Sequence, residues 1–311
     1  MPALPPTTAH PLAADPDAGW WIERFGADFL LSAVPGADAH ARSLDLIRDW
    51  CQRQKAPLAR VFLRELVAAG GDQHAPELIH RAPDAPPADA PGEACEHGLR
   101  YGLDFGAYTV GLFLDQAQNR KRVATARPGE RLLNLFAYTC SFSVAAAARG
   151  AETLSVDLAR PALERGRANF ALNGLATDPD AGDRRPRQRF LADDAFAVLP
   201  RLARRGERFD WIVLDPPTFS RGKRGSKKKV FRVERDLPEL IALCWEVLAP
   251  GGRLLVSTNC AAFDRAALAS AITAALREAD ASPKSYELQD APTVGEVPTP
   301  APATAWWVER A

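Results

Sequence analysis

Acidic residues follow several short apolar runs in the second half of the chain. Asp157 ends the run LSVD, Asp193 and Asp194 end FLADD, and Asp215 directly follows WIVL. Such runs predict buried strands, and the carboxyl ends of parallel strands meet at one edge of a sheet. Carboxylates gathered there can accept hydrogen bonds from the hydroxyl and amino groups of a nucleoside. Binding of a nucleoside is therefore the first chemistry that these residues predict.

The turn after the first of these strands indicates which nucleoside cofactor is bound. Residues 132–151 (LLNLFAYTCSFSVAAAARGA) pass from a strand into an alanine-rich helix without the pattern GxGxxG. A dinucleotide needs glycine amides against its pyrophosphate, whereas S-adenosylmethionine has no phosphate. Asp157 lies about 20 residues beyond the turn, the spacing at which a carboxylate binds ribose hydroxyls. These residues favour S-adenosylmethionine over NAD or FAD. Asp193 and Asp194 either bind adenine or only cap the next helix.

The motif LDPPTFS (residues 214–220) predicts a rigid corner after the fourth strand. Asp215 and the carbonyl of Pro216 are fixed acceptors there, Pro217 stiffens the chain, and Phe219 offers a stacking surface. Enzymes that modify bases hold the extracted base between apolar groups and read its edge by hydrogen bonds. A strand-ending turn with a core phenylalanine is the alternative. Together with the two preceding sites, the motif favours a base pocket.

The run RGKRGSKKKVFR after Phe219 has no acidic residue and seven basic ones: Arg221, Lys223, Arg224, Lys227, Lys228, Lys229 and Arg232. Beside a base pocket such a loop can neutralise RNA phosphates and position the RNA without specifying its sequence. The alternative is a solvated mobile loop. A second basic cluster is interpreted as a solvated loop: Arg184, Arg185, Arg187 and Arg189.

The elements that position these residues alternate between strands and helices, which is typical of a parallel sheet covered by helices on both faces. Strands are predicted at residues 131–136, 153–157, 189–192, 210–214, 253–258, 284–289 and 304–309. Helices are predicted at residues 140–149, 161–173, 195–204, 234–248 and 264–280. The sequence therefore predicts a doubly wound α/β domain that binds ligands at the carboxyl ends of its strands.

The N-terminal part has a different pattern. Residues 1–18 are rich in Pro, Ala and Thr and predict a mobile tail, and the proline-rich residues 81–95 predict a linker. Between them, residues 19–80 predict a small α+β accessory domain, with strand-like runs at 20–34 and helical spacing at 39–54 and 56–69. Residues 96–311 form the predicted catalytic domain, in which the proline-rich residues 291–302 are interpreted as a loop.

Composition limits the classes of protein that are possible. The chain has 311 residues, 47% of them hydrophobic. Its 39 Lys and Arg balance its 39 Asp and Glu, so any surface that binds nucleic acid must be a local cluster of basic residues. Five scattered cysteines without a CxxC pair argue against structural zinc and a disulfide framework. Neither a signal peptide nor a membrane span is recognisable, which predicts a cytoplasmic protein that binds no membrane and no metal. The oligomeric state is not indicated.

From about Gly98 onward the chain resembles the class I S-adenosylmethionine-dependent ribosomal RNA large-subunit methyltransferases of the I and K type. The similar segments occur in the family's order: GLFLDQAQNR (111–120), NLFAYTCSFSVAAAARGA (134–151), SVDLARPALERGRANFALNGL (155–175), LDPPTFSRGKR (214–224) and APGGRLLVSTN (249–259). The resemblance implies a Rossmann-like fold with a mainly parallel seven-stranded sheet, and RNA as partner. The first 95 residues lack a recognisable PUA or THUMP module.

The resemblance also implies roles for individual residues. Phe136, Tyr138 and Thr139 should line the methionine end of the cofactor, Asp157 the ribose, Asp194 the adenine, and Asp215 the reacting centre. Gln116, Arg120 and Asn134 of the similar segments, and Asp193 after the third strand, complete the expected cofactor site.

Two acceptor atoms in RNA fit this sequence. Guanine N7 has a free lone pair and needs no base, whereas methylation of cytosine C5 needs a thiolate. Relatives that methylate C5 have a catalytic cysteine after the fifth strand, where this chain has Asn259 and then Cys260. Cys260 is either that nucleophile or a buried small hydrophobe, and Cys140 is expected to pack near the cofactor. Two other functions remain: methylation of a protein or small molecule, and a noncatalytic RNA-binding role.

Overall fold

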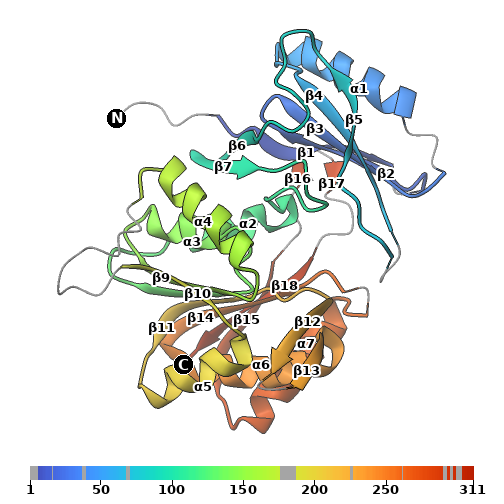
Figure 1. Cartoon of the computed structure of the whole chain (residues 1–311). Helices are drawn as coiled ribbons and strands as arrows, with labels where there is room; N and C mark the ends of the chain where they lie inside the picture. The colour runs from blue at the N-terminus through green and yellow to red at the C-terminus, as the bar shows by residue number, and fades with distance from the viewer. Residues whose placement is uncertain are drawn as a thin grey trace. The chain divides into compact units, whose positions relative to one another are not determined.

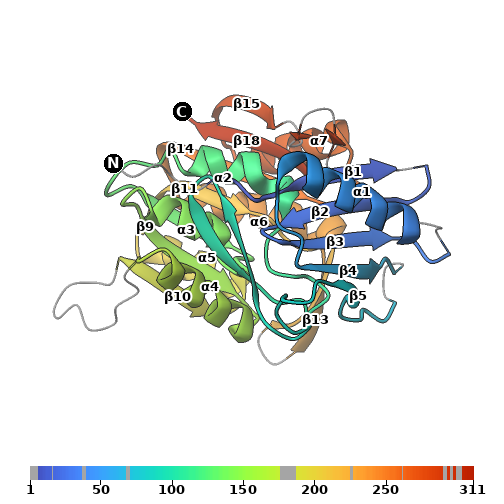
Figure 2. The same cartoon turned by 90° about the horizontal axis from the view of Figure 1, so that it is seen from above.

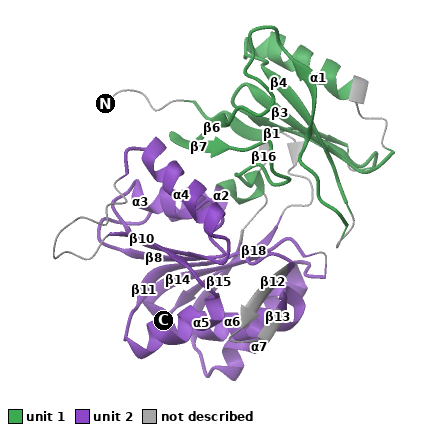
Figure 3. Cartoon of the chain, viewed as in Figure 1, with its two compact units in different colours: residues 1–117, 292–300 green, residues 118–291, 301–311 purple. Residues whose placement is uncertain are grey.

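The structure is a computed structural model that describes residues 6–15, 17–36, 40–67, 71–175, 187–224, 227–260, 262–289, 293–294, 297–298 and 303–311. The chain divides into two compact units, residues 1–117 with 292–300 and residues 118–291 with 301–311 (Figure 3). The first division lies at residues 117–118, later than the boundary predicted over residues 81–95.

The second unit has the predicted α/β architecture. Its described strands form a seven-stranded sheet in the order β10-β9-β8-β11-β14-β18-β15. The strands are β8 (Arg131–Leu135), β9 (Glu152–Asp157), β10 (Gln188–Ala192), β11 (Phe209–Leu214), β14 (Leu248–Thr258), β15 (Pro283–Gln289) and β18 (Thr304–Arg310). All pairs from β10 to β14 are parallel, and β18 pairs antiparallel with β14 and β15. The mainly parallel seven-stranded sheet is thus confirmed.

Helices cover both faces of this sheet (Figure 1). They are α2 (Ala117–Val123), α3 (Ser141–Ala147), α4 (Arg160–Leu172), α5 (Ala195–Arg204), α6 (Val233–Val247) and α7 (Arg265–Glu278). Successive side chains of a strand point to opposite faces of the sheet, so each strand packs against helices on both faces. Leu133 and Ile212 pack with α5, α6 and α7, whereas Leu132 and Trp211 pack with α2 and α3. Both layers rest on central strands that are buried on both faces, as parallel sheets require.

The first unit is built around a five-stranded sheet in the order β1-β2-β3-β4-β5, on which α1 lies (Figure 2). Its elements are β1 (Ala9–Asp15), β2 (Trp20–Phe25), β3 (Asp28–Ala33), α1 (His40–Gln54), β4 (Arg60–Glu65), β5 (Glu77–Arg81), β6 (Gly92–Glu96), β7 (Leu99–Leu103), the 3-10 helix η1 (Leu114–Gln116), β16 (Thr293–Val294) and β17 (Val297–Pro298). Trp20 and Ile22 pack against Ile47 of α1 in the core of this unit.

Three predictions for the N-terminal part are wrong. Strand β1, within the predicted tail, pairs with β2. Strand β4 replaces the helix predicted at residues 56–69, because its parallel pairing with the buried strand β3 overrides helical spacing. The predicted linker is held in place, since the buried Arg60 pairs with Asp28 and donates to the carbonyl oxygens of Pro87 and Ala90 at 2.8 and 2.7 Å.

Candidate functional site

The carboxyl ends of the parallel strands bring most of the predicted site residues together. In the sheet register, Leu135 of β8 lies opposite both Val156 of β9 and Leu214 of β11, and Ala192 of β10 lies opposite Asp157. The segments that follow these strands therefore start at one edge of the sheet. They are residues 136–140, 158–159, 193–194 and 215–219.

The turn after β8 has an unusual backbone. Phe136, Tyr138 and Cys140 have φ values of 55°, 47° and 60°, in the left-handed region that favours glycine. We call residues 136–140 the donor loop, because the sequence analysis expects them to line the methionine end of the methyl donor. It adopts glycine-like conformations without glycine, which is why the absence of GxGxxG does not prevent a tight turn here.

Helix α4 holds the donor loop in this conformation. Asn169 Nδ2 donates to the carbonyl oxygen of Thr139 at 3.0 Å. Gly166 lies directly against Cys140, so that a Cβ atom at position 166 would lie 2.4 Å from Cys140 Sγ and 3.0 Å from its Cβ. Only glycine fits at this contact.

Asn134, a predicted cofactor residue, lies in β8, two residues before the donor loop. It is 1% exposed, and its Nδ2 donates to Ser143 Oγ at 3.0 Å, while Ser155 Oγ donates to the same hydroxyl at 2.8 Å. The three side chains join β8, β9 and α3 in a buried polar network. Asn134 thus joins the strand before the donor loop to the helix after it.

Asp157 ties the donor loop to β9. Its Oδ2 accepts from the backbone N–H of Tyr138 at 2.8 Å and its Oδ1 from that of Ala159 at 2.7 Å. Burial raises the pKa of this carboxyl, and the backbone N–H groups of Ala159, Tyr138 and Leu158 partly oppose the increase. A carboxylate has about four acceptor sites. Three backbone bonds therefore leave capacity for one more donor.

The two aspartates after β10 differ in their surroundings. Asp193 forms an ion pair with Arg201 of α5 and accepts from the backbone N–H of Asp194. Asp194 is the N-cap of α5, because its Oδ1 accepts from the N–H of Phe196 at 2.9 Å. Asp194 thus caps α5, and this single bond leaves most of its acceptor capacity available.

The corner after β11 presents acceptors and an exposed ring. Pro216 and Pro217 have no backbone N–H, so these two residues offer only carbonyl oxygens, which accept hydrogen bonds. Thr218 Oγ1 donates to Asn259 Oδ1 at 3.1 Å, which ties the corner to the end of β14. The Phe219 side chain is 48% exposed, unlike a core phenylalanine.

Comparison with known proteins identifies the fold family. The S-adenosylmethionine-dependent methyltransferase family model matches residues 87–306. The chain belongs to this family. The chain is 38% identical over 170 residues to ribosomal RNA large subunit methyltransferase K of Neisseria meningitidis serogroup B, covering 54% of this chain and 45% of that protein.

One further relative and one solved structure extend the comparison. Ribosomal RNA large subunit methyltransferase I of Aeromonas hydrophila is 33% identical over 247 residues, 78% of this chain and 58% of that protein. The chain thus spans about half the length of these two curated relatives. The crystal structure of SMU.776 complexed with S-adenosylhomocysteine (SAH) has a TM-score of 0.74 at 24% identity, covering 97% of this chain and 75% of that chain, which shows a shared fold.

The residues at the carboxyl edge fit the cofactor, S-adenosylmethionine. Asp157 retains an acceptor site for a ribose hydroxyl, and the adjacent Leu158 is 45% exposed, which offers an apolar surface to a flat adenine ring. The sequence analysis missed Leu158, although an apolar residue directly after a strand-ending aspartate is a usable signal. The predicted Gln116 and Arg120 are both buried, in η1 of the first unit and in α2 of the second.

The basic run after Phe219 forms a hairpin and not the predicted loop. Strands β12 (Phe219–Arg224) and β13 (Lys227–Arg232) pair antiparallel from Phe219 opposite Arg232 to Arg224 opposite Lys227. We call residues 219–232 the basic hairpin. Its backbone is described except at residues 225–226, and the side chains of residues 220–229 lie outside the description. Phe231, which the sequence analysis missed, packs against Phe136 of the donor loop with ring centroids 5.6 Å apart.

The five cysteines are free and buried. Burial raises the pKa of the Cys140 thiol to about 12, so this residue packs and does not react, as expected. Cys260 is 6% exposed in the core cluster beneath α6 and α7, and its Sγ lies 3.7 Å from Glu234 Oε1.

Among the residues that the structure describes, no helix could cross a membrane, and no cluster of three metal-ligating side chains occurs.

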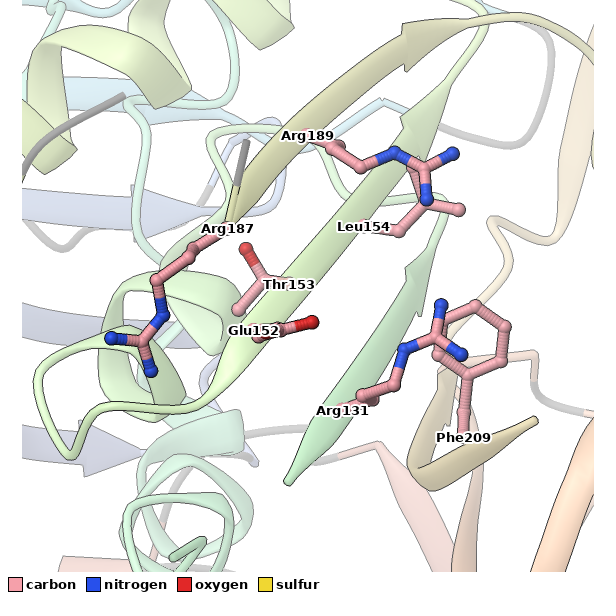
Figure 4. Close-up of a pocket in the computed structure, with 7 residues that line it drawn as sticks. All are labelled: Arg131, Glu152, Thr153, Leu154, Arg187, Arg189 and Phe209. Carbon is pink, nitrogen blue, oxygen red and sulfur yellow. The ribbon is translucent and has the colours of Figure 1, made fainter. Parts of the chain in front are cut away.

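A pocket at the opposite, amino edge of the sheet is lined by Arg131, Glu152, Thr153, Leu154, Arg187, Arg189 and Phe209 (Figure 4). Its arginines are engaged within the protein. Arg131 and Arg189 share the carboxylate of Glu207 at 2.7 and 3.5 Å, and Arg187 donates to the carbonyl oxygen of Gly150. The interpretation as a solvated loop is wrong for Arg189, which lies in β10 and is partly buried, whereas Arg187 is exposed before that strand and Arg184 and Arg185 lie outside the described residues.

The raised pKa of Asp157 predicts a specific pH dependence of stability. Because its folded-state pKa lies above the ordinary value of 3.8, Asp157 stabilises the fold fully below that pH. This contribution is lost as the pH rises through the folded-state pKa. The free energy of unfolding of the wild type, relative to that of Asp157→Asn, should therefore fall as the pH rises above about 4. Urea unfolding of both proteins across this range tests the sign, which a constant difference would contradict.

Proposed function

We propose that the protein transfers a methyl group from S-adenosylmethionine to a base of ribosomal large-subunit RNA. The observation that carries the proposal is the position of the basic hairpin, which continues directly from the corner at Asp215 at the carboxyl edge of the sheet. The names of the curated relatives support the same substrate. An RNA substrate also places the protein in the cytoplasm.

The chain's own residues hold the two reactants in line for transfer. S-adenosylmethionine supplies an electrophilic methyl group on its sulfonium. We assign Asp157 and Leu158 to the ribose and adenine, Asp194 to the adenine amino group, and the backbone of the donor loop to the aminoacyl end. Fixing the donor and the base in near-attack geometry accounts for most of the catalysis that such a displacement needs.

The corner holds the target base. Asp215 and the carbonyl oxygens of Pro216 and Pro217 accept hydrogen bonds from its edge, and the exposed ring of Phe219 stacks on its face. The basic hairpin binds flanking phosphates, so RNA affinity should fall steeply with salt. Its residues Arg221, Lys223, Arg224, Lys227, Lys228, Lys229 and Arg232 remain the proposed phosphate contacts.

The acceptor that the site supports best is guanine N7. A cytosine C5 reaction needs a thiolate at the base, and Cys260 instead lies in the core against Glu234. Cys260→Ala should therefore retain methyl transfer within about twofold while losing about 1 kcal/mol of stability. The check is the single-turnover rate at saturating donor, beside a urea titration. Loss of all transfer by a folded Cys260→Ala protein that still binds SAH would instead favour cytosine C5.

The proposal is tested with radiolabelled S-adenosylmethionine and RNA and protein extracts from a strain that lacks this gene. We expect label in large-subunit RNA, and nucleoside digestion should assign it to 7-methylguanosine. Label in protein or in a small molecule would refute the RNA substrate and leave the methyltransferase family assignment intact. Binding of SAH and RNA without transfer would indicate a noncatalytic role.

A further inference from the structure

Asn259 lies beside the corner that holds the base in the proposed function. It directly follows β14, which pairs in parallel with β11 so that Val256 lies opposite Leu214. The segments after these two strands therefore begin side by side at the carboxyl edge of the sheet. Thr218 Oγ1 in the corner donates to Asn259 Oδ1 at 3.1 Å, and both residues are exposed. The side chain of Asn259 is thus available to a base bound at the corner.

The structure fixes Asn259 from two sides. The buried Thr258 accepts at its Oγ1 from the N–H of Cys260 at 3.2 Å, so a side-chain-closed turn holds the residue between them. On the other side, the carbonyl oxygen of Thr218 accepts from the N–H of Val233 in α6 at 3.2 Å. The Asn259 amide therefore lies between two anchored segments and needs no rearrangement to bind a ligand.

The bond from Thr218 determines which end of this amide a ligand meets. A carboxamide has one oxygen, which accepts, and one NH2 group, which donates two hydrogen bonds. Because the oxygen is engaged, the Nδ2 group is directed away from Thr218, and no residue in the described part of the chain accepts from it. The Asp215 carboxylate and the carbonyl oxygens of Pro216 and Pro217 are acceptors. Asn259 thus places a donor next to a row of acceptors.

We propose that Asn259 selects guanine by donating from Nδ2 to O6 of the target base. This inference rests on the proposed function. Around its edge, guanine has an amino group, N1–H, O6 and then N7. Asp215 can accept from the amino group and from N1–H while Asn259 donates to O6, which leaves N7 facing the methyl donor.

The same pattern rejects the other bases that have an exocyclic amino group. Adenine has an amino group in place of O6, and cytosine has one at the corresponding position of its ring. Either base would put a donor against the Nδ2 group, and its unprotonated ring nitrogen would face the Asp215 carboxylate. A site that is built to hydrogen-bond one group strongly disfavours an analogue that leaves its polar groups unpaired.

The experiment changes one atom on each side of the proposed bond. The guanosine that radiolabelled donor marks in large-subunit RNA is located first, and RNA fragments are made with guanosine or 6-thioguanosine at that position. Sulfur accepts hydrogen bonds weakly, whereas N1–H, the amino group and N7 remain. We expect the wild type to methylate the 6-thioguanosine RNA about tenfold more slowly in single turnovers at subsaturating RNA. Asn259→Ala should be about tenfold slower on guanosine and should no longer discriminate between the two RNAs.

A second variant separates selection of the base from support of the corner. Asn259→Asp keeps the size of the side chain and the acceptor for Thr218, but it replaces the Nδ2 donor by an oxygen. It should slow transfer to guanosine about 100-fold. Ala262→Asp is the matched control, because it adds the same charge at an exposed position three residues later and should stay within about twofold of the wild type. Calorimetric binding of SAH shows that each variant retains its fold.

The outcomes distinguish this inference from the function on which it rests. Absence of label in RNA refutes both. Label on adenine or cytosine refutes the selection of guanine and leaves RNA methylation intact. Equal wild-type rates on the two RNA fragments, or discrimination that persists in Asn259→Ala, refute the bond to O6 alone. If Asn259→Asp transfers at the wild-type rate, Asn259 only braces the corner and the inference is wrong.

Discussion

Substitution of Asp215 by alanine is expected to lower the single-turnover rate of methyl transfer roughly 100- to 1000-fold at saturating donor. Asp215 directly follows β11 at the carboxyl edge, beside two prolines that cannot donate. In the proposed site the Asp215 carboxylate is the charged group that holds the base. Without this carboxylate the base moves out of line with the methyl donor. The rate is measured by rapid quench with radiolabelled donor and unmodified RNA.

Asp210 provides a matched control at the other end of the same strand. Its Oδ2 accepts from the backbone N–H of Arg131 at 2.8 Å, at the amino edge of the sheet. Asp210→Asn keeps an acceptor there and should transfer methyl groups within about twofold of the wild-type rate. If Asp215→Ala transfers as fast as this control, Asp215 does not hold the base.

Replacement of Gly166 by alanine should damage the donor loop without touching the donor. The added Cβ would lie 2.4 Å from Cys140 Sγ, so α4 and the loop must separate. Overpacking of this kind costs about 1–3 kcal/mol. If the separation also breaks the bond from Asn169 to Thr139, the affinity for SAH should fall about tenfold. Urea unfolding and calorimetry measure the two effects.

The same contact offers a compensating change. Cys140→Gly removes both clashing atoms, and glycine suits the φ of 60° at this position. The double variant Gly166→Ala with Cys140→Gly should therefore recover most of the SAH affinity. If Gly166→Ala binds SAH normally, or the double variant recovers nothing, the loop is not held by this contact.

The sequence predicted the α/β unit well because its strands are apolar on both faces and its helices are amphipathic. Each predicted strand of the seven-stranded sheet agrees with its observed bounds within a few residues, apart from the early start of β14 at Leu248. The N-terminal unit was harder. Residues 56–69 have apolar residues at helical spacing, yet pairing with β3 makes residues 60–65 a strand. Local composition likewise gave no sign that residues 9–15 pair with β2.

The candidate site was predictable where function requires a charge and less so where it requires packing. Asp157, Asp194 and Asp215 stand out as acids after apolar runs. Phe231 does not, since its partners Phe136 and Phe196 are distant in sequence and only the fold brings them together. The glycine-like turn of the donor loop was also hidden, because its left-handed residues are a phenylalanine, a tyrosine and a cysteine.

The left-handed donor loop has a consequence for the thermodynamics of binding. Each strained residue stores roughly 1–3 kcal/mol, which the fold supplies through Asn169, Asp157 and the buried network around Ser143. The loop is therefore preorganised, and the conformational entropy of about 1–2 kcal/mol per residue is lost during folding and not on binding. Because the loop is already ordered, binding of the methyl donor loses less conformational entropy, and the affinity for the donor is higher.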